Sequence, residues 1–247
     1  MSADLSKTTL VAGALLGDAP VVRYRGSERM NACYRYEVEV ALPSGSALLE
    51  LMHVGVLGHE AKLTMAEVGY QRMLHGFVTS VGNGRPLDAE TTLVNVEITP
   101  RLSLLGLRTH SRIFQDKTGP EVIKLVLDEW GVAYRADLVG SYDHRPYVTQ
   151  YKETDLAFVE RMLSEEGIAT YFDQSGDNEV LVMLDAPSSY SSIGARHYRG
   201  FAGGMAEDEI ASFDVQRRVR PSAARLGDFD FRRPLLQLRA LEVVKEE

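Results

Sequence analysis

Apolar and polar residues alternate along much of the first hundred positions. A period of two runs through residues 34–42 and again through residues 94–98. The apolar positions of the first run are Tyr34, Tyr36, Val38, Val40 and Leu42. Such a period predicts strands with one buried face.

Glycine and proline interrupt this pattern at regular intervals. We expect turns at residues 43–46 and at residues 82–86, where these residue types cluster. Short strands with turns between them predict a small barrel or sandwich. We assign residues 1–110 to this first barrel-like domain.

The period changes to that of a helix after residue 111. Thr118 and Glu121 have the spacing of a capping box, and Pro120 suits a first turn. An apolar stripe then runs from residue 122 to Trp130, and Gly131 is a stop signal. The pattern predicts a helix of about three turns.

A second helix is predicted from Thr154, a plausible N-cap, to Gly167. Phe158 lies beside its apolar stripe. If Phe158 and Trp130 are buried, replacing either with alanine should cost about 3–5 kcal/mol. Residues 168–172 and 180–184 then read as a hairpin. Residues 111–205 therefore form an α+β middle domain with two helices.

The last third returns to strand patterns. We expect strands at residues 210–215 and 229–231 and one more element at residues 235–241. Residues 206–247 would begin a second barrel-like domain that looks incomplete, so we expect the native protein to continue. The predicted fold class is α+β, mainly β: a barrel-like domain, an α+β insertion and the start of a second barrel-like domain.

Composition narrows the possible functions. The 247 residues carry a net charge of -8, which opposes non-specific binding to nucleic acid. One cysteine, Cys33, allows no intrachain disulfide and favours folding in a reducing compartment. No apolar run reaches the length of a membrane span, and no signal peptide is recognisable. We expect a protein assembled in the cytoplasm, without stable membrane insertion.

Sites for catalysis, cofactors or metals are not predicted. The six histidines lack a zinc spacing, and motifs of serine hydrolases and phosphate loops are missing. Cys33 reads as structural, because a reactive thiol needs a low pKa and a partner. Glu165 and Glu166 are adjacent on a helix and point apart, so they do not form an acid pair. A cell-wall hydrolase stays a remote alternative.

One segment is strongly basic. Between residues 212 and 239 seven arginines stand against three aspartates, so this segment is +4 and the rest of the chain is -12. A solvated strand pair is the plain interpretation. The sharper hypothesis is an electrostatic contact with another subunit or partner. The interface candidates are Arg217, Arg218, Arg220, Arg232 and Arg233.

Two stretches are more specific than these patterns. Residues 111–116 read S-R-I-F-Q-D, and residues 147–163 read Y-V-T-Q-Y-K-E-T-D-L-A-F-V-E-R-M-L, followed by E-E-G-I at 165–168. With H-G-F-V at 75–78 and D-F-D-F-R-R-P at 228–234, they resemble the VgrG family of type VI secretion spikes. The motif positions that we interpret as fold determinants are Arg112, Phe114, Gln115, Gln150, Tyr151, Glu153, Asp155, Phe158, Glu166 and Gly167.

The resemblance implies a structural hub and no enzyme. Such hubs are homotrimers whose chains each carry two similar barrels, so that six barrels match a hexameric Hcp-like tube ring. It also implies baseplate proteins and effectors or adaptors as partners, and export by the injection machine. The alternative within this class is the hub of a contractile phage or of an extracellular injection particle.

Overall fold

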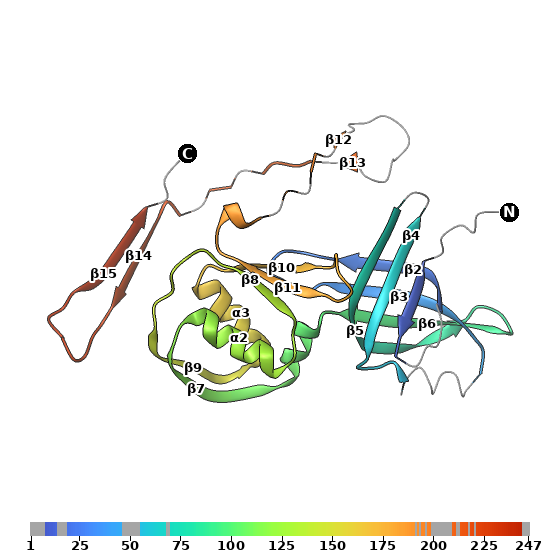
Figure 1. The fold of residues 1–247 in the computed structure, drawn as a ribbon, viewed down its shortest axis with the longest axis horizontal. Coiled ribbons are helices and arrows are strands. Elements are labelled where there is room, and N and C mark those ends of the chain that lie inside the picture. Colours follow the sequence, from blue (N-terminus) through green and yellow to red (C-terminus); the bar gives the residue numbers. More distant parts are fainter. Residues whose placement is uncertain are drawn as a thin grey trace. The chain divides into compact units, whose positions relative to one another are not determined.

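The computed structural model describes residues 8–13, 19–45, 55–67, 70–190, 192, 194–195, 197–198, 209–210, 213–216, 218–219 and 221–243. The chain divides into two compact units, Met1–Ser192 and Ile193–Glu247. The first unit holds a closed barrel and a helical lobe (Figure 1). The predicted boundaries at residues 110 and 205 remain predictions.

Six antiparallel strands close the barrel in the order β1-β2-β3-β6-β5-β4. Their bounds are β1 Thr9–Ala12, β2 Ala19–Ser27, β3 Arg35–Pro43, β4 Glu60–Glu67, β5 Tyr70–Pro86 and β6 Thr91–Thr99. The alternating residues predicted to face inward, from Tyr34 to Leu42, are all buried in the barrel core. The predicted strands at 34–42 and 94–98 are confirmed.

The turn predicted at residues 82–86 is wrong. Strand β5 continues through this segment to Pro86, and its register with β6 shifts between Gly82 and Arg85. A glycine in a strand can mark a bulge as well as a turn. The reversal comes later, where the backbone N–H of Leu87 donates to the Thr91 carbonyl.

The lobe packs a helix pair against two small sheets. A short 3-10 helix, η1 (Arg101–Leu107), leads from the barrel into β7 (Thr109–Lys117), α2 (Gly119–Glu129) and β8 (Tyr134–Asp137). Then follow β9 (Arg145–Thr154), α3 (Asp155–Glu165), β10 (Ala169–Asp173), β11 (Val180–Leu184) and η2 (Pro187–Ser189). Strands β7 and β9 form an antiparallel ribbon that curves around the two helices (Figure 1).

Both helices begin and end at the predicted signals. Thr118 and Glu121 form a complete capping box at α2, and Thr154 caps α3 by accepting from the backbone N–H of Ala157. Gly131 and Gly167 follow the helices with positive φ, a conformation that glycine adopts without strain. Phe158 is fully buried in the lobe core, whereas Trp130 is only half-buried.

The described part of the second unit has little regular structure. Strands β12 (His197–Tyr198) and β13 (Glu209–Ile210) pair in parallel, and β14 (Ala223–Asp228) and β15 (Leu238–Val243) form an exposed hairpin. The strand predicted at 229–231 is wrong, because Asp230 accepts from the backbone N–H of Arg232 and turns the chain there. Within the described ranges, no helix is long and apolar enough to cross a membrane.

Gly76 in β5 allows a close approach of neighbouring atoms. A Cβ atom there would lie 2.7 Å from the Tyr34 hydroxyl and 2.8 Å from the Thr99 carbonyl oxygen. We expect Gly76→Ala to lower the free energy of unfolding by about 1–3 kcal/mol, because backbone and core atoms must shift. Urea denaturation checks this, with Gly45→Ala as control, since a Cβ at Gly45 meets nothing within 4 Å. Equal stability of the two variants would contradict the expectation.

Candidate functional site

The two most specific sequence stretches lie side by side in the β7–β9 ribbon. Their register pairs Arg112 with Gln150 and Phe114 with Val148. These four side chains face the helices, while Gln115 and Tyr151 point outward and are exposed. The motifs far apart in sequence therefore build one local structure.

Asp155, the first residue of α3, is the centre of a buried polar cluster. Its carboxylate accepts hydrogen bonds from Arg108 Nε at 2.6 Å, Gln150 Nε2 at 2.8 Å and Trp130 Nε1 at 2.9 Å. The guanidinium of Arg112 lies 3.4 Å away. Asp155 and Gln150 are both 0% exposed. Through this cluster one carboxylate connects the ribbon, both helices and Arg108, the residue that follows η1.

Arginine side chains compensate the charge buried in this cluster. Glu129 bridges Arg108 and Arg112 at 2.7 Å each, and Arg108 lies 4.8 Å from the Trp130 ring centroid. Burial pushes the pKa of Asp155 upward, but hydrogen bonds from Gln150, Trp130 and Arg108 outweigh it and hold the pKa below its ordinary value. The carboxylate is therefore ionised at neutral pH.

The other motif residues also hold the lobe together. Phe114 stacks on Phe158 with ring centroids 5.6 Å apart. Glu153 accepts from Arg161 at 2.7 Å, on the flank of α3. Glu166 accepts from Arg145 at 2.7 Å and packs on the open face of Gly119. Apart from the outward Gln115 and Tyr151, these motif side chains make internal contacts and form no open catalytic arrangement.

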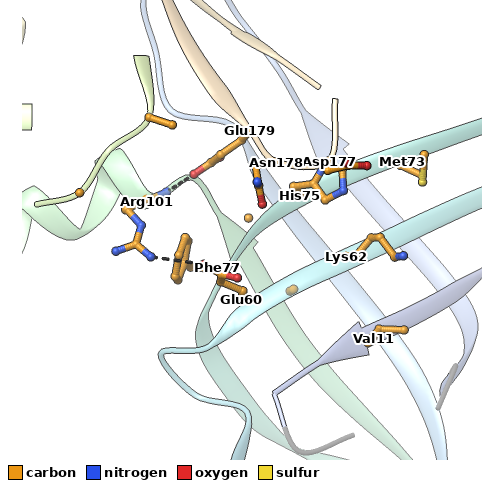
Figure 2. A pocket seen from close by; sticks show the side chains of 14 residues that line it. Val11, Glu60, Lys62, Met73, His75, Phe77, Arg101, Asp177, Asn178 and Glu179 are labelled. Carbon is orange, nitrogen blue, oxygen red and sulfur yellow. Dashed lines mark hydrogen bonds and ion pairs between the residues drawn. The ribbon is translucent and has the colours of Figure 1, made fainter. Parts of the chain in front are cut away.

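A cavity of about 590 Å³ lies where the barrel meets the lobe. Figure 2 shows the Arg101 side chain over the Phe77 ring. The guanidinium carbon lies 4.2 Å from the ring centroid, and the backbone N–H of Arg101 donates to Glu179. Acidic and basic side chains mix along its wall: Glu60, Lys62, His75, Arg101, Asp177 and Glu179. Sequence patterns do not predict this site, because residues 173–178 read only as the connection of a hairpin.

The arginine-rich interface candidates are partly described. Arg218, Arg232 and Arg233 belong to the second unit and are exposed. Arg232 lies over the Phe231 ring, and Arg233 pairs with Asp230 at 3.1 Å. Arg217 and Arg220 lie outside the described residues. In the described part, the basic segment is therefore a solvent-facing surface, and its role as an interface stays a prediction.

Among the described residues, His, Cys, Asp and Glu side chains form no group that could hold a metal ion. Cys33 is half-buried against the lobe core, and burial raises the pKa of its thiol to about 12. A thiol that stays protonated is a poor nucleophile. The geometry of Cys33 therefore suits packing better than covalent chemistry.

Known proteins are similar to this chain in sequence and in fold. A model of the family "Phage tail baseplate hub (GPD)" matches residues 27–247. The type VI secretion system spike protein VgrG4b of Pseudomonas aeruginosa is 33% identical over 240 residues, which cover 94% of this chain and 28% of that protein. Spike protein VgrG5 of the same organism is 34% identical over 231 residues, covering 90% of this chain and 28% of that protein.

A solved structure agrees with these matches. The c3393 protein of E. coli, described as a type VI secretion component similar to the phage T4 tail proteins gp27 and gp5, superposes with a TM-score of 0.63. It is 26% identical and is matched over 77% of this chain and 51% of its own. The barrel and lobe thus define a tail-hub type of module. The chain belongs to the phage tail baseplate hub family and spans about 28% of the length of the two Pseudomonas spike proteins.

Proposed function

We propose that this chain is the N-terminal hub module of a type VI secretion spike, where it docks on the end of an Hcp-like tube. The family match over residues 27–247 carries this proposal. Its closed six-stranded barrel supplies the unit that such a ring would repeat. In the proposed assembly three full-length chains, each with this barrel and the second barrel that residues 206–247 would begin, present six barrels to the six subunits of the tube.

The role is structural in this proposal, and effectors or adaptors are carried by other parts of the spike. Most of its motif side chains make internal contacts around Asp155 and Phe158. The chain folds in the cytoplasm and leaves the cell with the fired machine. A contractile phage or an extracellular injection particle is the second candidate, because the matching family model is that of a phage tail hub.

Deletion of the gene tests the spike role in its host. We expect the deletion to abolish release of the tube protein into the medium, and complementation with the full gene to restore it. Unchanged release in the deletion strain, with no other spike gene present, would contradict the secretion role. Loss of phage particle assembly instead would support the second candidate.

The basic segment is proposed to contact the acidic surface of another subunit or of the tube. We expect the double variant Arg218→Glu and Arg232→Glu in the full gene product to weaken tube binding at least tenfold, since charge reversal turns attraction into repulsion. Both side chains are exposed, so the fold should survive. Arg29→Glu, an exposed change in the first unit, is the control. Tube binding unaffected by the double variant would exclude this segment from the contact with the tube.

A further inference from the structure

Glu179 lies at the junction of the barrel and the lobe, directly before β11. The backbone N–H of Arg101, the first residue of η1, donates to its Oε1 atom at 2.6 Å. Its Oε2 atom is a hydrogen-bond partner of the Tyr34 hydroxyl, and Tyr34 belongs to the barrel core. One half-buried carboxyl group therefore connects the lobe hairpin, the barrel and the segment that links them.

The Tyr34 hydroxyl has more acceptors than protons. It lies within hydrogen-bond distance of both the His75 carbonyl oxygen and Glu179 Oε2, yet a phenol donates a single proton. Both contacts are satisfied at once only when Glu179 carries a proton and donates it to the Tyr34 oxygen. Tyr34 then donates to His75. With Glu179 ionised, one of the two acceptors loses its donor.

Burial disfavours the ionised form of the Glu179 carboxyl group, while the nearby charges act in both directions. Burial raises the pKa of Glu179 to about 7, although the hydrogen bonds from Tyr34 and Arg101 act in the opposite direction. The negative charge of Glu60 on β4 raises it further, and the Arg101 guanidinium lowers it. Asp177 on the turn and Lys62 on β4 line the same cavity (Figure 2).

Unlike Glu179, the neighbouring titratable groups keep their charge state around pH 7. Burial raises the pKa of Tyr34 and of Cys33, so both stay neutral around pH 7. Burial lowers the pKa of His75, so this imidazole is neutral there too. Glu179 is the group of this junction that we expect to gain or lose a proton near neutral pH.

We propose that Glu179 is a proton-controlled latch between the barrel and the lobe. When Glu179 is protonated, the chain Glu179 to Tyr34 to His75 is complete and the β10–β11 turn is held on β5. When it ionises, Tyr34 donates to the carboxylate, and the His75 carbonyl loses Tyr34 as a donor but keeps the side-chain amide of Gln174, at 3.2 Å. The hydrogen-bond path from the turn through Tyr34 to β5 is then interrupted, while the charged carboxylate keeps its hydrogen bonds from Tyr34 and from the backbone N–H of Arg101.

The latch is connected to the lobe helices through Arg101. This residue donates from its backbone to Glu179 and from Nη1 to the Trp130 carbonyl oxygen at 3.3 Å. Trp130 in turn donates to Asp155 at 2.9 Å. Trp130 is the single tryptophan of the chain, so its fluorescence reports on this path without labelling.

Titration of Trp130 fluorescence between pH 5 and pH 9 tests the latch. In the unmodified chain we expect a transition with a midpoint near pH 7. Glu179→Gln keeps the shape of the protonated side chain and an N–H donor toward Tyr34. We expect this variant to show no transition and to keep the Trp130 spectrum of the protonated form up to pH 9. Tyr34→Phe removes a hydrogen bond that favours ionisation, so its midpoint should move to higher pH.

Two control variants separate Glu179 from its neighbours. Glu60 lines the same cavity, and its charge raises the pKa of Glu179. The variant Glu60→Gln removes this charge and should keep the transition, with its midpoint at a slightly lower pH. His110 lies beside Asp155, near its contact with Trp130. The variant His110→Gln should leave the midpoint of the fluorescence transition unchanged. A transition that persists in Glu179→Gln would overturn the proposal. If that variant does not fold, carbon-13 NMR of the glutamate carboxyl groups decides, and the absence of a glutamate titrating near pH 7 would overturn it.

Discussion

Replacing Asp155 with alanine is expected to lower the free energy of unfolding by about 3–5 kcal/mol, because it leaves buried hydrogen-bond donors and two arginines without their carboxylate. Urea denaturation of the chain measures this. Asp155→Asn keeps an oxygen acceptor and should lose less. Asp143→Ala, an exposed aspartate in the same lobe, is the matched control and should change stability by about 0.5 kcal/mol or less. A loss below about 1 kcal/mol in Asp155→Ala would mean that the cluster does not hold the lobe together.

The same carboxylate gives the lobe a defined dependence on pH. The pKa of Asp155 is lower in the folded chain than in the unfolded chain. Its contribution to stability is therefore present above the ordinary aspartate pKa and is lost as the pH falls through the lower, folded pKa. Glu179 acts in the opposite sense: its contribution is present at acid pH and is lost as the pH rises through about 7.

Truncating Phe158 to alanine is the second large effect that we expect, with a loss of about 3–5 kcal/mol in unfolding free energy. Its side chain is 0% exposed and stacks on Phe114, so the variant leaves a cavity between helix and ribbon. Thermal denaturation followed by circular dichroism measures it. Leu125→Ala removes a similar apolar group from the exposed side of α2 and should be nearly neutral. Similar melting temperatures for both variants would place Phe158 outside the core.

Local signals in the sequence predicted the helices well. A capping box and a glycine stop are short-range features, and Thr118, Glu121 and Gly131 determine the ends of α2 without help from distant residues. Strand alternation from Tyr34 to Leu42 likewise depends only on which face is buried. These features are readable because the side chains that decide them are neighbours in sequence.

Features that depend on distant contacts were missed. The pairing of β7 with β9 joins segments almost forty residues apart, and no local signal indicates its register. The motif residue Asp155 was recognised, but its partners Arg108 and Trp130 lie outside the motif stretches, as does Glu129, which pairs with Arg108. Glu179 belonged to no predicted element, and only the fold brings Tyr34 to it. Glycines at 82 and 84 were ambiguous because a bulge and a turn use the same residue.

The mass of the full gene product, alone and mixed with its tube protein, tests the hub assignment most directly. Light scattering coupled to size-exclusion chromatography measures both. We expect three chains to associate and to bind one hexameric ring of the tube. A protein that stays monomeric and elutes apart from the tube ring at micromolar concentration would contradict the proposed function.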